Sequence, residues 1–546
     1  MLVLPNQLLA SCVTAAMLTA AGIGLPTTTP VAPTGPDREA RPLPSISSGA
    51  SSGEEANSAD ERAARIRQGE IYAKAACQQC HLFPSPDLLD KRSWQTYVLP
   101  KMMLYLGLSS LDQVKVSDPE LVKASGIVPT VPRIPPSYWG PIVTYYLQSA
   151  PDTAAPQAVK APVHVGLKQF KVEPPRFRRN PPLTTLVQID PDTHQIYTGD
   201  AQAQALDILG PDGAPQQSIE LGNIPVAMKK TEQGFYLGCI GHFFPSERKQ
   251  GQLLFLERTP RGYERKVILS DLPRVSDIEL ADLNGDGRTD LVLSMFGYLT
   301  GRLSWFENAG GDQYREHVLF PKAGAMQTAV RDYNQDGTPD IAVLLGQEND
   351  GLLLLENDKK KPGTFLSRDV MRKPPSFGPD YFEPVDFNQD GRLDFLVVNG
   401  DAADFPQPPK NYHGIHLYLD RGNNHYEEAF FYPMNGAFKA LARDFDQDGD
   451  LDITAIAFFP DYEHRPMESF VYLENLGDLK FAASTFQQSL VGRWLTMDAG
   501  DLDGDGDLDV VLGSLSQMPG HPIPPKIQEF WDKRGPSILI LRNTLR

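Results

Sequence analysis

The sequence predicts a mainly β protein, in which a seven-bladed β-propeller occupies residues 164–546 and a small all-α domain precedes it at residues 58–150. Three observations predict this fold class. A nine-residue aspartate loop recurs five times in the second half of the chain, and two weaker repeats come before it. Gly and Pro, at 45 and 48 residues, are abundant enough to indicate many turns between short strands.

The composition limits the function classes. The chain has 51 Lys and Arg against 69 Asp and Glu, a net charge of −18, so it has no basic excess with which to hold a phosphate backbone. Nucleic-acid binding is therefore not expected. The apolar fraction of 41% is enough for a sizeable core, whereas four cysteines are too few for a disulfide scaffold in 546 residues.

Residues 1–25 are predicted to be a signal peptide. Residues 12–25 carry no charge and are mostly small or apolar, and this run is too short to span a bilayer. We therefore expect export, to the periplasm or the cell surface. No basic residue precedes Arg38, so a chance apolar tail stays open as the alternative. The Leu-Ala-Ser-Cys sequence ending at Cys12 is similar to a lipoprotein cleavage box, which leaves a lipid anchor open as the one membrane contact.

Residues 26–57 are rich in Pro, Thr, Ser and Gly and are expected to form a flexible linker. The motif C-x-x-C-H then occurs once, at Cys77, Cys80 and His81. In this pattern two thiols add to the vinyl groups of a haem and the histidine coordinates the iron. A thioredoxin-like redox pair and half of a zinc site are the alternatives, but the chain has no second C-x-x-C. We predict one covalent haem c, and a buried free thiol at the distant Cys239.

Two expected helices flank the motif. Residues 59–76 have amphipathic character, and residues 137–147 are rich in aromatic side chains. The order of helix, C-x-x-C-H, methionine and terminal helix resembles a small class I cytochrome c over about residues 58–150. Residues 94–106 are similar to the corresponding stretch of cytochrome-like domains that are fused to repeat propellers.

This second resemblance implies Met102 as the iron ligand opposite His81. Met103 stays open as the ligand, and so does a five-coordinate iron with both methionines in packing roles. We also expect a backbone carbonyl near Pro84 or Pro86 to accept the imidazole N–H of His81, because iron-bound histidines are usually oriented by such a bond.

The repeated loop has the pattern D-x-[DN]-x-D-G-x-x-D. Oxygen side chains at positions 1, 3, 5 and 9, with a glycine at position 6 that permits a sharp reversal, suit a hard cation such as Ca²⁺. We predict about five Ca²⁺ ions. The predicted metal ligands are Asp282, Asn284, Asp286, Asp290, Asp332, Asn334, Asp336, Asp340, Asp386, Asn388, Asp390, Asp394, Asp444, Asp446, Asp448, Asp452, Asp501, Asp503, Asp505 and Asp509.

An EF-hand would carry an acid at position 12 of the loop and a helix on either side. Position 12 is instead apolar and lies within β-type runs; it is Leu293, Val343, Val397, Ala455 and Leu512 in the five copies. The loops therefore belong to β-hairpins. Their predicted role is structural, because bound Ca²⁺ would offset the repulsion among the aspartates.

Each loop is followed by an apolar strand, a variable loop, a third strand that usually ends in Glu-Asn, and a more polar fourth strand. Four strands in about 50–60 residues make a propeller blade. Weaker repeats at residues 186–212 and 226–258 bring the count to seven. From about residue 164 to the end the chain resembles FG-GAP or VCBS repeat proteins, the integrin-like calcium propellers. More narrowly, stretches such as Tyr412-His-Gly and Gly492-Arg-Trp resemble exported bacterial proteins that join this propeller to a C-x-x-C-H domain.

Loops between second and third strands are expected on the face opposite the aspartate loops. They carry the aromatic and histidine side chains of which binding sites are often built. These side chains include Tyr412, His413, Tyr462, His464, His521 and Trp531.

Three functions stay open. The favoured one is an exported monohaem c-type electron-transfer protein whose propeller binds a partner protein or glycan. The second is an enzyme, either a haem-coupled oxidoreductase or a polysaccharide-degrading enzyme, with its site on that loop face. The third is an adhesion or scaffold protein. No catalytic residue is assigned, because no HExxH, Walker, nucleophile-elbow or dinucleotide motif occurs. The expected partners are a redox protein and a polysaccharide or cell-surface protein.

The last blade needs a strand from elsewhere in the chain. Only three residues follow Asn543, which leaves no sequence for a fourth strand, and an unpaired edge would expose backbone N–H and C=O groups. Residues 164–172 alternate between apolar and polar. We expect them to pair with the strand near residues 537–542 and to close the ring, with residues 151–163 as the linker to the α domain.

Overall fold

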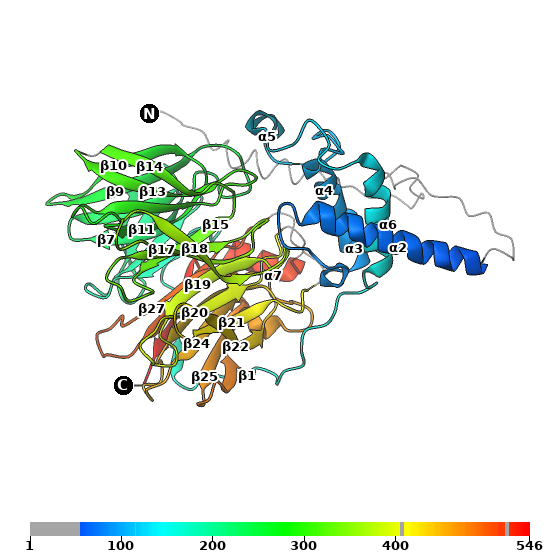
Figure 1. The fold of residues 1–546 in the computed structure, drawn as a ribbon. Coiled ribbons are helices and arrows are strands. Elements are labelled where there is room, and N and C mark those ends of the chain that lie inside the picture. Colours follow the sequence, from blue (N-terminus) through cyan, green and yellow to red (C-terminus); the bar gives the residue numbers. More distant parts are fainter. Residues whose placement is uncertain (1–54, 115, 312, 404–408, 519–522, 546) are drawn as a thin grey trace, which may run out of the picture.

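The computed structural model describes residues 55–545 apart from 115, 312, 404–408 and 519–522. The predicted signal peptide, Cys12 and residues 26–54 of the predicted linker lie outside the described residues. Figure 1 shows two parts, a ring of β-sheets and a helical segment, drawn in blue and cyan, on one side of the ring. Among the described residues, no helix is both long enough and apolar enough to cross a membrane.

Seven β-sheets of four strands each form the ring, and one of them has a fifth strand. The seven-bladed propeller predicted from the repeats is therefore confirmed. Blade 1 consists of β3 (Thr184–Ile189), β4 (Ile196–Asp200), β5 (Ala205–Leu209) and β6 (Pro215–Glu220), and blade 2 of β7 (Pro225–Thr231), β8 (Gly234–Cys239), β9 (Gly251–Thr259) and β10 (Gly262–Leu272). Blade 3 consists of β11 (Val275–Ala281), β12 (Asp290–Met295), β13 (Arg302–Gly310) and β14 (Gln313–Phe320), blade 4 of β15 (Ala325–Arg331), β16 (Asp340–Leu345), β17 (Gly351–Asn357) and β18 (Phe365–Arg372), and blade 5 of β19 (Pro379–Val385), β20 (Asp394–Asn399), β21 (Gly414–Asp420) and β22 (Tyr426–Pro433). Blade 6 contains β23 (Ala437–Arg443), β24 (Asp452–Ala457), β25 (Phe470–Asn475) and β26 (Phe481–Thr485), and blade 7 contains β27 (Trp494–Gly500), β28 (Asp509–Ser514) and β29 (Ile538–Asn543).

The burial of the strands follows the apolar pattern of the sequence. Every residue of β12, β16, β20, β24 and β28 is buried, because the second strand of a blade is covered on both of its faces. The outer strands, such as β10 and β14, are largely exposed. The core is therefore a series of apolar layers between neighbouring blades.

Side chains of the innermost strands join one blade to the next. The carboxylate of Asp277 accepts a bond from the amide of Thr328 at 2.8 Å, and Glu383 does the same for Ala442 at 2.9 Å. Asp498 of the last blade accepts from Ile189 of the first at 2.8 Å, so this pattern also spans the junction at which the ring closes. Buried amide groups gain partners in this way without a continuous sheet.

The predicted ring closure is confirmed for the second half of residues 164–172. Strand β2 (Phe170–Val172) pairs antiparallel with β29, with Phe170 opposite Asn543, and supplies the fourth strand of blade 7. The first half behaves differently, because β1 (His164–Val165) pairs parallel with β26 and becomes the fifth strand of blade 6. The N-terminal end of the propeller therefore ties the last two blades together.

The segment before the propeller is helical. Its helices are α2 (Glu55–Cys77), η1 (Pro86–Leu88), α3 (Lys91–Ser93), the π-helical turn η2 (Trp94–Val98), α4 (Leu99–Tyr105), α5 (Pro119–Ser125), η3 (Pro136–Tyr138) and α6 (Trp139–Ser149). Helices α2 and α6 cross closely at Gly69, where a Cβ atom would lie 2.1 Å from the carbonyl oxygen of Pro141, so that only glycine fits. Trp94 and Tyr146 lie in the core beside this crossing, with ring centroids 4.2 Å apart.

The helical segment packs on the loops that join second and third strands. Asp118, which precedes α5, contacts Ser246 of blade 2, and Gln157 donates to the carbonyl of His413 in blade 5 at 3.0 Å. The linker is held further along by Lys160, whose ammonium lies 3.0 Å from Glu468 and 4.0 Å from the centre of the Tyr432 ring. The aspartate loops join first and second strands, so they lie on the opposite face of the ring.

Candidate functional site

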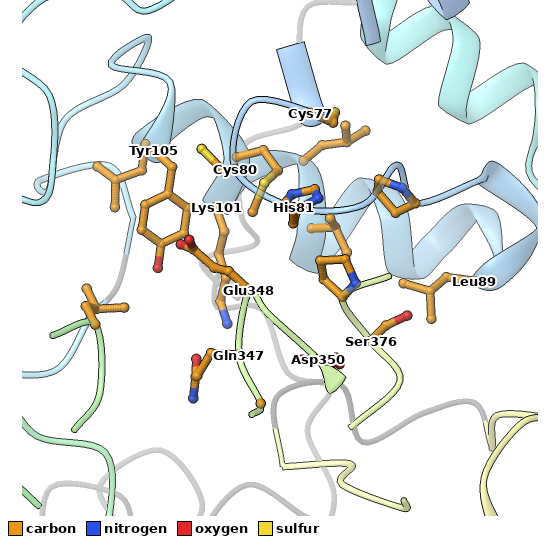
Figure 2. A pocket seen from close by; sticks show the side chains of 18 of the residues that line it. Cys77, Cys80, His81, Leu89, Lys101, Tyr105, Gln347, Glu348, Asp350 and Ser376 are labelled. Atoms are coloured by element: carbon orange, nitrogen blue, oxygen red, sulfur yellow. The ribbon is translucent and has the colours of Figure 1, made fainter. Parts of the chain in front are cut away.

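A cavity lies between the helical segment and the propeller, and all three residues of the C-x-x-C-H motif line it. Met102 of α4 lines the same cavity. The propeller contributes the loops after β12, β16 and β20 and the connection from β18 to β19. Figure 2 shows Cys80, His81 and Lys101 on the helical side and Gln347 and Glu348 on the propeller side of the same space.

The end of helix α2 brings the motif residues together. Helix α2 ends at Cys77, and the amides of Cys80 and His81 both point to the Cys77 carbonyl, at 3.4 and 3.5 Å. This single turn places both sulfurs and the imidazole at one end of the cavity. Both thiols are free of disulfides. The Sγ atom of Cys77 lies 3.9 Å from the hydroxyl of Tyr146, and the Sγ atom of Cys80 lies 3.7 Å from Nη1 of Arg133.

The orientation of His81 differs from the expectation. Its Nδ1 atom lies 2.8 Å from the carbonyl oxygen of Leu82, not from that of Pro84 or Pro86. Those two carbonyls are already used: Pro84 accepts from the hydroxyl of Tyr146 at 2.9 Å, and Pro86 accepts from the indole of Trp94 at 2.8 Å. An N–H at Nδ1 that donates to Leu82 leaves the Nε2 lone pair for a metal.

The two candidate methionines differ in position. Met102 lines the cavity, whereas Met103, one residue further along α4, does not. Neighbouring residues of a helix point in directions about 100° apart, which accounts for the difference. Met102 as the axial ligand stays a prediction, and its position is compatible with that role.

Burial shapes the acid–base properties of the cavity. Burial raises the pKa of the Cys77 thiol to about 11, although the nearby Tyr146 hydroxyl lowers it in part, so this thiol is protonated at neutral pH. On the propeller side, burial raises the pKa of Asp350 to about 8, against the lowering effect of the Gly378 amide and the Lys410 charge. Sequence reasoning missed the propeller side of the site, because no motif marks these loop residues.

The aspartate loops form a second candidate site. In each loop the carboxylate at position 1 accepts the backbone amide of the position 6 glycine, and Asp282 accepts the amides of both Gly285 and Gly287, at 2.8 Å. Two of the five loops bring three carboxylate oxygens within 4.8 Å of one another, and they do so with Asp444, Asp446 and Asp448, and with Asp501, Asp503 and Asp505. Grouped carboxylates of this kind suit Ca²⁺.

The carboxylates at position 9 have a different environment from positions 1, 3 and 5. All five are fully buried; they are Asp290, Asp340, Asp394, Asp452 and Asp509. Each accepts the amide of loop position 2 and an amide at the end of the third strand, as Asp290 does from Leu283 at 3.2 Å and from Asn308 at 2.8 Å. The position 9 carboxylate therefore fastens the loop to the third strand of its blade.

An asparagine stands at position 3 in the first three loops, and in the first and third it donates to the aspartate at position 5. Asn284 donates to Asp286 at 3.1 Å, and Asn388 donates to Asp390 at 3.0 Å. The same two aspartates pair with Arg288 and Arg392. Part of the negative charge of these loops is therefore already balanced by the protein.

Position 4 has a role that the sequence analysis did not identify. It has a positive φ in all five loops and is Gly285, Gln335, Gln389, Gln447 and Gly504. Each glutamine donates to the carbonyl of the position 6 glycine in the next loop, at 2.8, 2.6 and 2.9 Å. The sequence signal that could have identified this role is the recurrence of glutamine at position 4 in three of the five loops.

Several aromatic and histidine side chains of the loops between second and third strands have structural roles. His413 and Trp531 are buried, and the indole of Trp531 donates to the Leu490 carbonyl at 2.8 Å. Tyr412 bonds with Ser376 at 2.9 Å. His464 is largely exposed beside Asp461, and His521 lies outside the described residues. Cys239 is fully buried, as predicted.

A family model described as FG-GAP-like repeat matches four overlapping stretches of the chain, at residues 282–343, 332–397, 386–455 and 444–512. The chain contains FG-GAP-like repeats. Each stretch runs from one aspartate loop to just beyond the next, so the matches together cover the five loops. No curated protein sequence matches the chain.

Among solved structures, the chain is similar to BBS1N in complex with ARL6DN. In crystals soaked with mercury the identity is 10%, over 68% of this chain and 93% of that chain, with a TM-score of 0.40. In crystals soaked with lead the identity is 10%, over 69% of this chain and 96% of that chain, with a TM-score of 0.41.

Proposed function

We propose that the protein is an exported electron-transfer protein that carries one haem c, attached to Cys77 and Cys80, in the cavity between its helical segment and its propeller. The observation that carries the proposal is that both cysteines, His81 and Met102 line one cavity. A cysteine pair, an imidazole and a thioether form the donor set of a c-type haem with two axial ligands. The donor chemistry therefore fits the cofactor.

Each residue has a defined task. The sulfurs of Cys77 and Cys80 would form the thioether bonds, and Nε2 of His81 and the sulfur of Met102 would hold the iron. The Leu82 carbonyl keeps the proton of His81 on Nδ1. Trp94 and Tyr146, which are almost fully buried, keep water from the helical side of the cavity. The bound haem would supply one-electron chemistry, whose potential depends on the axial ligands and on burial.

The propeller has two proposed roles in this function. Its loops form the second wall of the cavity and so restrict access of solvent to the cofactor. The remaining loop surface, which includes α7 (Pro525–Arg534) between β28 and β29, is proposed to bind a redox partner protein, with a polysaccharide or cell-surface protein as the second class of ligand.

We also propose that the aspartate loops bind about five Ca²⁺ ions with a structural role. Carboxylate clustering at two loops and the wrapping of loop backbone around each position 1 aspartate support this assignment. The ions would neutralise charge on one face of a chain whose net charge is −18.

Haem attachment is tested on the full chain exported from a bacterium that has the c-type attachment machinery. We expect the spectrum of a c-type haem in the reduced protein, and a mass increase of one haem that survives denaturation. Cys77→Ala and Cys80→Ala should each lose one thioether bond, which shifts the reduced spectrum. Cys239→Ala is the matched control and should retain both bonds. A folded wild-type protein without covalent haem would refute the proposal.

A further inference from the structure

The propeller wall of the cavity contains one carboxyl that is nearly out of contact with solvent. Asp350 immediately precedes β17, lines the cavity together with His81 and Met102, and is 2% exposed. Its Oδ2 atom accepts the amide of Gly378 at 3.0 Å. Its Oδ1 atom is buried and has no hydrogen-bond partner among the described residues. A buried carboxylate oxygen without a partner is costly, whereas the protonated form reduces that cost.

Charges of both signs lie around Asp350. Lys410 and Asp401, on the connection from β20 to β21, line the same cavity, and Lys410 donates to the Asp401 carbonyl at 3.0 Å. Asp380 of β19 is half-buried, and its Oδ2 atom, which is buried, also has no hydrogen-bond partner among the described residues. Glu348 is on the same connection as Asp350, and Lys101 of α4 lines the cavity from the helical side (Figure 2).

We propose that Asp350 is the proton acceptor of the electron-transfer site: it takes up one proton at Oδ1 when the site is reduced and releases that proton on oxidation. This inference rests on the proposed function. The electron comes from the redox partner protein. The proton comes from a hydronium ion of the solvent, in which one O–H bond breaks as one O–H bond forms at Asp350, and no bond within the chain breaks. On oxidation both leave again.

The physical reason is the coupling of two charges in a poorly solvated space. An added electron makes the site more negative, which disfavours the carboxylate and favours the acid form of Asp350. By linkage, protonation of Asp350 favours reduction to the same extent. Burial already raises the pKa of this carboxyl to about 8, so the change of protonation falls in a pH range in which the protein can be studied.

The test is a redox titration of the intact, haem-loaded protein followed by absorption across neutral and mildly alkaline pH. We expect the midpoint potential of the wild type to fall as pH rises, by up to about 59 mV per pH unit, because one proton per electron gives that limit. Asp350→Asn, which retains an acceptor for the Gly378 amide, should flatten this dependence. Asp350→Glu should retain a dependence at a shifted pH, and it serves as the second variant if the asparagine variant does not fold.

Asp369→Asn is the control, since Asp369 is an exposed carboxylate of β18, in the same blade, and does not line the cavity. It should leave the slope unchanged. A haem-loaded wild type whose potential is independent of pH would overturn the inference while leaving the proposed function intact. The same holds if Asp350→Asn keeps the slope and Asp380→Asn removes it. A protein without covalent haem would instead be recognised from its reduced spectrum, before any redox titration. Failure of the proposed function and failure of this inference are therefore distinguishable.

Discussion

Asp118 of the helical segment accepts a hydrogen bond from the Ser246 hydroxyl of blade 2, with 2.6 Å between Oδ2 and Oγ. The same carboxylate accepts the amide of Glu247 at 3.2 Å and lies 3.3 Å from Nε of Arg248. The Glu247 carboxylate in turn accepts the amide of Thr300, next to Leu299 in the cavity wall. Asp118 therefore fixes the helical segment to the loops that form the propeller side of the cavity.

Asp118→Ala should loosen this attachment by about 2 kcal/mol, because it removes bonds to a charged acceptor. Hydrogen exchange at the amides of α5 and of Thr300 should become faster, while the melting temperature of the propeller stays unchanged. The exposed Asp112, in the same segment, provides the control substitution Asp112→Ala, which should change neither quantity. Equal exchange in the two variants would contradict the role of Asp118.

The axial methionine can be identified by paired substitutions. Met102→Ala should abolish the weak sulfur-to-iron absorption of the oxidised protein, since Met102 lines the cavity and its neighbour does not. Met103→Ala should leave that absorption in place. If only the Met103 variant loses the band, the assignment is wrong, and if neither variant does, a thioether is not the ligand.

Removal of Ca²⁺ should lower the melting temperature, because ions that bind the folded chain alone stabilise it by linkage. Metal analysis should give about five ions per chain. Asp446→Asn, in a loop with three grouped carboxylates, should lose about one ion, whereas the exposed Asp478→Asn should lose none. A melting curve that does not respond to thorough chelation would contradict the structural role.

Phe170 tests the closure of the ring. Its side chain is 7% exposed and packs edge-to-face on Phe445 and Tyr472, with both ring centroids 5.7 Å away. Phe170→Ala should lower the free energy of unfolding by about 3–5 kcal/mol. Val165→Ala on β1 is the control, because Val165 is 47% exposed, and it should cost well under about 1 kcal/mol. Comparable losses in chemical unfolding would argue against closure through β2.

Two substitutions of Gln389 can separate two opposing contributions to the free energy of unfolding at loop position 4. Gln389→Ala should lower the free energy of unfolding by about 1 kcal/mol through loss of the bond to Gly449. Gln389→Gly loses the same bond but relieves the positive φ of 57°, which is worth about 1 kcal/mol, so it should be nearly neutral. Denaturant titration distinguishes the two, and equal losses would show that the backbone conformation costs little.

The fold was predictable where its determinants are local. An aspartate at position 1 and a glycine at position 6 organise each loop by themselves, so five blades could be counted directly from the chain. The closing strand, β2, was predictable because the third strand of blade 7 would otherwise have no partner at its outer edge. The separate pairing of His164 and Val165 with blade 6 was not predictable, because alternation of apolar and polar residues does not say which edge a strand will join.

The site divides in the same way. Cys77, Cys80 and His81 lie within one turn of chain, so their spacing alone predicts their proximity. The opposite wall is assembled from loops of separate blades, in which Asp350 and Lys410 are distant in sequence and no short motif connects them. The predicted hydrogen-bond partner of His81 was wrong, because the Tyr146 hydroxyl and the Trp94 indole donate to the carbonyls of Pro84 and Pro86.

The position of the cavity between two parts of the chain has a consequence for biogenesis. Loops of blades 3 to 5 line the cavity on the side opposite Cys77 and Cys80, so they would restrict the approach of an attachment enzyme from that side. The helical segment precedes the propeller in the chain, so under the proposed export it would emerge before those blades have folded. Under the proposed function, the order of the two parts in the chain would therefore allow the haem to be attached before the folded propeller covers one side of the cavity.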